Sequence, residues 1–318
     1  MEKAKIYAIY WILLGIFFTY LLVSSTNLSS ASYYDNTSIE SRVNVTNKNP
    51  TVSQVNMYRF SNLAQANIDL TEGVTTTIIC NATVEDWNGW NDIAAVNATI
   101  YDQASFNSNS PNDNNSHYYQ GACSNTAINT TSLMYSCSFE VWYFANNAAW
   151  NCNVSARDLS NTTANAIDAS NPTFNMLAAL NLSARIMDFG NMQPGDITTD
   201  AAEPVINVTN SGNVNINLSV DGFGVTDGDG FAMNCTVGNI SLSFLRYNVS
   251  NDQSFANSMW NLTDSKLPSG IPAYIINRRV DDADYVKLNS TNSTYWKLWV
   301  PMGVKGFCNG TVTFSAVV

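Results

Sequence analysis

The stretch Thr75-Thr-Thr-Ile-Ile-Cys-Asn-Ala-Thr-Val84 alternates in character from one residue to the next. Ile78, Cys80, Ala82 and Val84 fall on one side, whereas Ile79, Asn81 and Thr83 fall on the other. A period of two over β-branched residues predicts a half-buried strand. The pattern returns at 93–101, 139–144 and 150–156, and long helical periodicity is absent from this half of the chain. The sequence therefore predicts an all-β protein built from two disulfide-bonded β-sandwiches.

Turn residues divide these strands. Trp87-Asn88-Gly89-Trp90 predicts a hairpin, because Asn-Gly favours two-residue turns. The run 205–220 predicts a second hairpin around Ser211-Gly212, with Val214, Ile216, Leu218 and Val220 in the core and Asn213, Asn215, Asn217 and Ser219 in water. Shifts in composition give the boundaries: 1–31 signal peptide or anchor, 32–51 polar tether, 52–165 first sandwich, 166–178 linker and 179–318 second sandwich.

The N-terminus has the order of an export segment. Lys3 and Lys5 precede an apolar run from Ile6 to Val23, and Ser29-Ser30-Ala31 follows it. Cleavage after Ala31 would release the chain, and an uncleaved run of this length could anchor it in a membrane. Cleavage before the apolar run, as in pilins, is the third alternative. All three place the remainder outside the cell.

Asparagine is unusually frequent and often stands in Asn-x-Ser/Thr sequons. The chain has 44 Asn and 60 Ser or Thr, so chance would give about 8 sequons, but 19 occur. This excess predicts N-glycosylation, and hence covalent glycans, at several sites. The predicted acceptors are Asn81, Asn97, Asn114, Asn129, Asn153, Asn161, Asn181, Asn207, Asn217, Asn239, Asn248, Asn261, Asn289, Asn292 and Asn309. Of these, Asn81, Asn97, Asn153, Asn207 and Asn217 are expected on solvent-facing strand positions.

Charge and histidine content exclude several functions. The 318 residues carry a net charge of -11, so no basic patch for nucleic acid can be assembled. The single histidine, His117, lies in an Asn-rich loop and is expected to be solvated. Motifs of hydrolases, metalloproteases and phosphate-binding loops are absent. Asp281-Asp282-Ala-Asp284 is expected to form a solvated loop. We therefore expect no enzymatic activity.

Six cysteines agree with export, because an even number in an exported chain implies disulfides. The preferred set is nested: Cys80–Cys152 around Cys123–Cys137, followed by Cys235–Cys308. The first four cysteines allow three pairings, and the sequence does not choose among them.

Three segments of the first half carry a resemblance to known protein families. Ile78-Ile-Cys-Asn-Ala-Thr-Val-Glu-Asp86, Asn91-Asp-Ile93 and Asn151-Cys-Asn-Val-Ser-Ala-Arg-Asp158 resemble immunoglobulin-like and PKD-like modules of prokaryotic, especially archaeal, surface proteins. This resemblance implies that Cys80–Cys152 joins two facing sheets, with Trp90 or Trp142 as the core tryptophan.

The second half carries a different likeness. Ile186-Met-Asp-Phe-Gly-Asn-Met-Gln-Pro-Gly195 looks like the opening of many secreted prokaryotic β-sandwiches, and Gly306-Phe-Cys-Asn-Gly-Thr-Val-Thr-Phe314 is similar to the last hairpin of WxL and camelysin/TasA-type domains. Trp296-Lys-Leu298 fits the WxL spacing, although Phe314 stands where a second Trp is expected. WxL domains bind cell walls and TasA-type proteins build fibres, so the resemblance implies assembly at a surface.

Oxygen-rich clusters are the candidate binding sites. Asp221, Asp227 and Asp229 lie among glycines and could hold Ca²⁺, although Asp-Gly pairs also form ordinary turns. Asp86, Asn88, Asn91, Asp92 and Asp158 could gather at one end of the first sandwich. Trp87 and Trp90 could stack on sugars or simply pack across their hairpin.

Together these features predict an exported, N-glycosylated, non-enzymatic cell-surface protein with a structural or adhesive role. Its expected partners are other surface proteins or copies of itself, and it would touch a membrane only through residues 6–23. One alternative is a filament subunit that assembles by strand exchange. Another is a Ca²⁺-dependent adhesin or carbohydrate-binding module.

Overall fold

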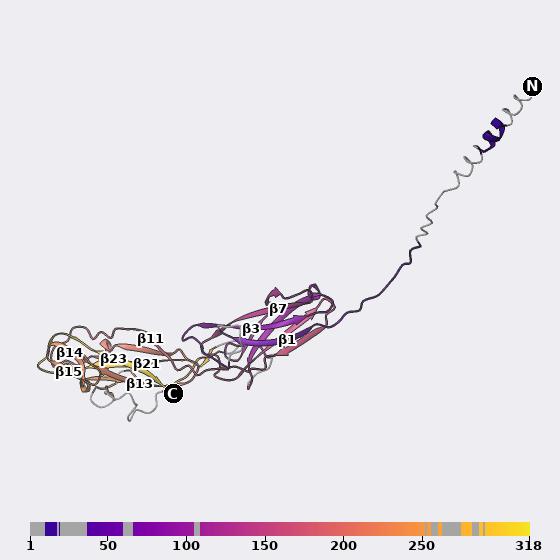
Figure 1. The fold of residues 1–318 in the computed structure, drawn as a ribbon. Coiled ribbons are helices and arrows are strands. Elements are labelled where there is room, and N and C mark those ends of the chain that lie inside the picture. Colours follow the sequence, from indigo (N-terminus) through magenta and orange to yellow (C-terminus); the bar gives the residue numbers. More distant parts are fainter. Residues whose placement is uncertain are drawn as a thin grey trace, which may run out of the picture. The chain divides into compact units, whose positions relative to one another are not determined.

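The computed structural model describes residues 10–17, 19, 37–59, 66–104, 109–251, 253–255, 260–262, 275–281, 286–288 and 290–318. The chain divides into two units, Met1–Thr46 and Asn47–Val318 (Figure 1). In the first unit, residues 10–17 are helical and residues 37–46 have no regular secondary structure. Over the described residues, no helix is both long and apolar enough to span a membrane. Most of the predicted signal or anchor lies outside the described residues.

The second unit is built almost entirely of strands and contains two hydrophobic cores. We call residues 47–177 the first half and residues 178–318 the second half. In the first half, two four-stranded antiparallel sheets enclose the first core. One sheet has the order β1 (Thr51–Tyr58), β3 (Thr75–Glu85), β7 (Ser132–Trp142) and β6 (Ser124–Ala127). The other has the order β5 (His117–Gln120), β4 (Ile93–Asp102), β8 (Trp150–Asp158) and β9 (Thr163–Ile167).

The predicted alternation is confirmed in β3 and β4. Ile78, Cys80, Ala82 and Val84 are buried, as are Val96, Ala98 and Ile100. The predicted hairpin between the two strands is wrong. β3 pairs with β1 and β7, whereas β4 pairs with β5 and β8, so residues 86–92 form an arch from one sheet to the other. A short 3-10 turn, η1 (Trp90–Asp92), ends this arch.

The core tryptophan of the first half is Trp150. Its side chain is fully buried and stacks on Phe174, with ring centroids 4.5 Å apart. Trp90 and Trp142 are 40% and 36% exposed, which corrects the expectation that one of them fills the core. Trp150 holds its place because it faces inward from the central strand β8, two residues before Cys152.

The predicted linker 166–178 belongs in part to the first core. Phe174 is fully buried, and Leu177 packs against the core. The short strand β10 (Thr173–Phe174) pairs in parallel with β2 (Asn67–Ile68). Asp168 is also buried and accepts a hydrogen bond from Met57 N at 2.9 Å.

The second core lies among three larger sheets. The first has the order β11 (Leu180–Leu182), β12 (Val205–Asn210), β21 (Thr291–Leu298), β16 (Leu245–Asn248) and β17 (Trp260–Asn261). The second is β18 (Ile275–Ile276), β13 (Ile216–Phe223) and β23 (Thr311–Val317), and the third is β15 (Asn239–Ser241), β14 (Phe231–Val237) and β22 (Lys305–Asn309). β19 (Val280–Asp281) pairs with β20 (Val286–Leu288), and the 3-10 turns are η2 (Asp200–Ala202) and η3 (Leu242–Phe244).

Neither predicted hairpin of the second half forms. β12 and β13 lie in different sheets, so the segment around Ser211-Gly212 is again an arch. Asn213 and Ser219, expected in water, are buried. β22 pairs with β14 and β23 with β13, so the closing run 306–314 passes from one sheet to the next at Gly310. A side chain there would lie 1.8 Å from Ala232 O, which explains the glycine.

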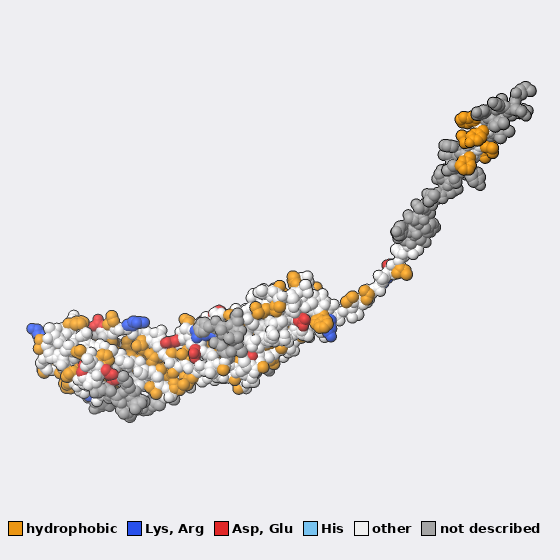
Figure 2. Space-filling view, viewed as in Figure 1, with side chains coloured by type: hydrophobic (Ala, Val, Ile, Leu, Met, Phe, Trp, Pro, Cys, Tyr) orange, Lys and Arg blue, Asp and Glu red, His pale blue; other side chains and the backbone are white. Residues whose placement is uncertain are grey.

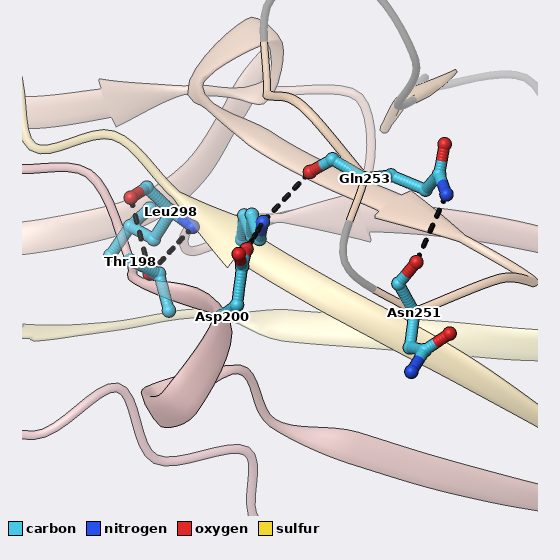
Figure 3. A network of polar contacts seen from close by, with 6 residues as sticks. Thr198, Asp200, Asn251, Gln253 and Leu298 are labelled. Carbon is cyan, nitrogen blue, oxygen red and sulfur yellow. Dashed lines mark hydrogen bonds and ion pairs between the residues drawn. The ribbon is translucent and has the colours of Figure 1, made fainter.

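Trp296-Lys-Leu298 packs within the protein. Trp296 is fully buried and contacts Phe314 edge to face, with centroids 5.8 Å apart. Lys297 is also buried and pairs with Asp200, while donating to Gln253 O at 2.7 Å (Figure 3). Leu298 exchanges hydrogen bonds with Thr198. Through this tripeptide, the end of β21 therefore binds η2 and the segment that contains Gln253.

Three disulfides brace the fold, and their pairs are the nested set preferred from sequence. Cys80–Cys152 joins the two sheets of the first half. Cys123–Cys137 closes a short loop onto β7. Cys235–Cys308 joins residues directly opposite each other on β14 and β22.

Candidate cation site

Three carboxylates meet at one end of the first half, where the arch 86–92 joins the two sheets. Asp86 follows β3, Asp92 closes η1, and Asp158 is the last residue of β8. The register pairs Ile93 with Asp158, which brings the end of β8 beside Asp92. One ligand oxygen from each of the three lies within 4.8 Å of the other two. The three carboxylates among the five residues predicted to gather here therefore do so, and Asn88 contacts Asp86 through its backbone N.

The cluster is largely shielded from solvent. Asp86 and Asp158 have no exposed surface, and Asp92 is half-buried. Asp86 Oδ1 accepts a hydrogen bond from Asn88 N at 2.8 Å. Among the described residues, Asp86 Oδ2 has no hydrogen-bond partner. A buried carboxylate oxygen without a partner is unfavourable and needs a cation or a proton nearby.

The pKa values of Asp86 and Asp158 shift in opposite directions. Burial raises the pKa of Asp86 above its ordinary value, and the neighbouring carboxylates of Asp92 and Asp158 raise it further. Burial also disfavours the charged form of Asp158, but hydrogen bonds from Thr162 and Asn47 outweigh it and lower the pKa of Asp158. The charged form is therefore favoured at Asp158 and disfavoured at Asp86, its neighbour in the cluster.

The first residues of the compact unit contact the cluster. Asn47 Nδ2 donates to Asp158 Oδ2 at 2.8 Å. Lys48 N donates to Asn88 Oδ1 at 2.7 Å. Thr162 also donates to Asp158, through its backbone N at 2.7 Å and through its hydroxyl. Sequence reasoning missed Asn47, because no local pattern links it to a residue 111 positions away.

The arrangement suits a calcium ion. Ca²⁺ binds oxygen ligands at about 2.3–2.6 Å, so two ligands of one ion are at most about 5 Å apart. Oxygens within 4.8 Å of one another meet this limit. Mg²⁺, with bonds of about 2.0–2.1 Å, would require a tighter group. None of the described basic side chains forms an ion pair with these carboxylates.

The other predicted calcium residues do not converge in this way. Asp229 accepts hydrogen bonds from the backbone N of Gly224, Val225, Thr226 and Phe231, at 2.7–3.1 Å. Asp221 is buried in β13, where its Oδ1 accepts from Gly222 N at 2.6 Å. Asp227 lies exposed at the tip of the same loop. The expectation of a shared site for Asp221, Asp227 and Asp229 is thus corrected: Asp229 closes the loop between β13 and β14.

Two predicted glycosylation sites are buried. Asn153 and Asn248 expose only 9% and 7% of their surface, because neighbouring segments cover the faces on which they lie. This corrects the solvent-facing position expected for Asn153. The acceptors that are exposed or half-buried are Asn81, Asn97, Asn114, Asn129, Asn161, Asn181, Asn207, Asn217, Asn239, Asn261, Asn292 and Asn309. Asn289 lies outside the described residues.

The remaining candidates behave differently from one another. His117 is 2% exposed, which corrects its expected solvation, because it begins β5 instead of lying in a loop. Trp87 and Trp90 do not pack across a hairpin, and Trp87 is 71% exposed. Asp282 and Asp284 lie outside the described residues. On the face drawn in Figure 2, the basic side chains stand apart from one another.

Comparison with known proteins gives no family. No family model matches the chain, and no curated protein matches it. Among solved structures, the C-terminal domain of the AgI/II polypeptide BspA of Streptococcus agalactiae aligns over 85% of this chain and 98% of that domain. The two share 10% identity with a TM-score of 0.21, and this likeness supports no inference about function. The resemblance to PKD-like and WxL modules gains no support from these comparisons.

Proposed function

We propose that this chain is an exported, N-glycosylated, non-enzymatic cell-surface protein whose first half binds Ca²⁺ through Asp86, Asp92 and Asp158. Three disulfides support export, because such bonds persist mainly in oxidising compartments. The excess of sequons supports glycosylation. The role is structural or adhesive: strands braced by disulfides carry loops and glycans at their surface.

One observation carries the calcium proposal. Asp86 is fully buried with a partnerless Oδ2 among the described residues, and two further carboxylates lie beside it. Like charges at this range repel, and the low polarity of a buried site strengthens the repulsion. A divalent cation supplies the missing positive charge and the missing ligand contact together. The ion would also hold Asn47 and Lys48 through Asp158 and Asn88, and so fix where the chain enters the first half.

Thermal unfolding of the full mature chain tests this proposal. At about 5 mM Ca²⁺, a site with the 10⁻⁴–10⁻³ M dissociation constant of extracellular calcium modules gains about 1–2 kcal/mol. We expect the melting temperature to rise with Ca²⁺ and to fall again with EDTA. An unchanged melting temperature under both conditions would contradict calcium binding.

Asp92→Asn separates binding from folding. Asp92 is half-buried, and none of the described residues donates a hydrogen bond to its side chain. The substitution removes a single negative charge, which attracts the ion when Ca²⁺ is present and repels the other two carboxylates when it is absent. It should therefore diminish the Ca²⁺-induced shift while leaving the protein in EDTA at least as stable as the wild type. The exposed Asp188→Asn is the matched control and should leave both values unchanged. A full Ca²⁺ shift in Asp92→Asn would place the ion elsewhere.

A second candidate function, a filament subunit, has its own observation. Ile39, Val43 and Val45 alternate along residues 37–46 and are 93%, 86% and 77% exposed. In an extended strand these three side chains share one face, opposite Glu40 and Arg42. A strand with one apolar face needs a partner to cover it.

The second half offers a complementary surface. A cavity of about 1190 Å³ lies beside its core, and its lining includes the apolar side chains of Met187, Phe189, Met192, Val304 and Phe314. In the described part of the chain, β23 is hydrogen-bonded to β13 alone and so forms a sheet edge. Residues 37–46 of a second copy could add to such an edge and bury their apolar face in the cavity.

Electron microscopy of the concentrated full-length protein tests this second candidate. Fibres are expected for the wild type, and Val43→Asp with Val45→Asp should abolish them. Arg42→Asp alters the opposite face and should retain them. Monodisperse monomer at high concentration would exclude assembly by this route.

A further inference from the structure

The sheet β5-β4-β8-β9 has a polar groove on the face turned away from the first core. Val96, Ala98 and Ile100 of β4 point into the core, so Asn97 and Thr99 point to the opposite face. The groove has a volume of about 620 Å³. This size lies within the range of small-molecule sites, about 300–1,000 Å³.

Strand register lines the groove with amides and hydroxyls. β4 and β8 pair Asn97 with Ser155 and Thr99 with Asn153. β8 and β9 then pair Ser155 with Asn165. Two Asn-x-Ser/Thr sequences thus run antiparallel, side by side, because residues i and i+2 of a strand share a face. The floor is a continuous array of neutral hydrogen-bonding groups.

Two of these groups are buried and lack a hydrogen-bond partner among the described residues. Thr99 and Asn153 expose 7% and 9% of their surface. Among the described residues, neither Thr99 Oγ1 nor Asn153 Oδ1 has a hydrogen-bond partner. Buried polar atoms are nearly always hydrogen-bonded, so both atoms need a polar partner that the described residues do not supply.

We propose that this groove binds a neutral saccharide. Among the described residues that line it there is no Asp, Glu, Lys or Arg, and His117 is the one residue there that can carry a positive charge, so the lining favours a neutral ligand over a charged one. An apolar ligand would leave Thr99 and Asn153 unpaired. Tyr119 of β5 also lines the groove and is 54% exposed, which offers an aromatic surface beside the amides and hydroxyls. Extended peptides pair with sheet edges, whereas the floor here is formed by the central strands β4 and β8.

The proposal is independent of the cation site and conflicts with part of the predicted glycosylation. A glycan attached to Asn97 or Asn153 would occupy the groove itself. The groove therefore requires both side chains to remain unmodified in the native protein, whatever the state of exposed sequons such as Asn207. Glycopeptide mass spectrometry of the native protein shows whether Asn97 and Asn153 carry glycans. A glycan on either residue would overturn the proposal.

Binding is measured by calorimetry on the full mature chain made in a host without N-glycosylation. The probes are neutral hexose oligosaccharides and, separately, N-glycans released from the native protein, which distinguishes an external saccharide from the protein's own. We expect saturable binding of at least one probe, with EDTA present. Absence of binding by every probe at millimolar concentration would overturn the proposal, whereas the calcium proposal is judged by its own melting shift.

Thr99→Val provides the decisive variant. Loss of one hydrogen bond to the ligand should weaken binding about tenfold. The melting temperature of the free protein should stay equal or rise, since the variant removes a buried hydroxyl that lacks a partner. A hydroxyl with a purely structural role would instead lower it. Thr126→Val, at an exposed position of β6, is the control and should leave affinity unchanged. Equal affinity in Thr99→Val and the wild type would overturn the site.

Discussion

Asp229 shows how one side chain organises a loop. Its carboxylate accepts four backbone hydrogen bonds within the loop that joins β13 to β14. Gly310 joins the strands β22 and β23, which pair with β14 and β13. Hydrogen bonds from Val225 N and Phe231 N lead this set, and together they lower the pKa of Asp229 to about 2. Each bond favours the ionised form, so the loop depends on that charge.

A pH-dependent stability follows from Asp229. Because its folded pKa lies below the unfolded value of about 3.9, its stabilisation is complete above pH 4 and is lost as pH falls toward 2. We expect Asp229→Asn to lower the melting temperature at pH 7 and to differ progressively less from the wild type below pH 4. Asp188→Asn, which replaces an acceptor of a single backbone bond, is the control. A difference that stays constant from pH 7 to pH 3 would contradict this role.

Single residues also mark where sequence reasoning reaches its limit. Alternation correctly placed Cys80 and Ile100 in the core, since it reports which residues share a face of a strand. It could not show whether the opposite face is covered. Asn153 and His117 both lie on the covered outer face of one sheet, and only the tertiary arrangement buries them. The Asp86 cluster was foreseeable because its members flank strand ends.

At the scale of elements, the main error concerns arches. Asn88-Gly89 and Ser211-Gly212 are sound turn signals, and the chain does turn at both. A hairpin and an arch contain similar turn residues, but the strands after an arch pair with different partners. Strand partners are set by contacts distant in sequence, which local pattern does not encode. The arch at 86–92 nevertheless produces the carboxylate cluster by placing Asp86 and Asp92 at the ends of two sheets.

The disulfides of the first half should differ in their contribution. Cys80–Cys152 spans 72 residues and Cys123–Cys137 spans 14. Removing a native disulfide costs roughly 2–5 kcal/mol, and the loop-entropy model assigns about 1.5 kcal/mol more to the longer loop. Burial acts in the same direction, because Cys80 and Cys152 are fully buried whereas Cys123 is half-buried.

Urea unfolding of two Cys→Ala double variants measures this difference. We expect the Cys80/Cys152 variant to lose more free energy of unfolding than the Cys123/Cys137 variant, each compared with the oxidised wild type. Equal losses would mean that the denatured chain is already restricted near the longer loop.

At the scale of the whole second unit, the arch around Ser211-Gly212 ties the two halves together. Gly73 N donates to Ser211 O at 3.2 Å, and Ser211 Oγ donates to Glu72 Oε1 at 2.8 Å. Asn213 exchanges two hydrogen bonds with Leu177, one through its side chain at 2.7 Å and one through its backbone at 2.9 Å. The buried segment between β12 and β13 therefore connects the first half, which contains the first core, to the second half, which contains the second core.

Gly212 makes this junction testable. A Cβ at this position would lie 2.0 Å from Leu177 O, so Gly212→Ala must push the arch away from residues 177–179. Each half keeps its own core and disulfides, so each should still fold. We expect one calorimetric transition for the wild type and two for Gly212→Ala. Asn213→Ala, which removes only the side-chain bonds, should broaden the transition, and the exposed Asn191→Ala should leave it unchanged. A single transition in Gly212→Ala would mean that contacts elsewhere, such as Arg278 with Phe144 O, suffice to couple the halves.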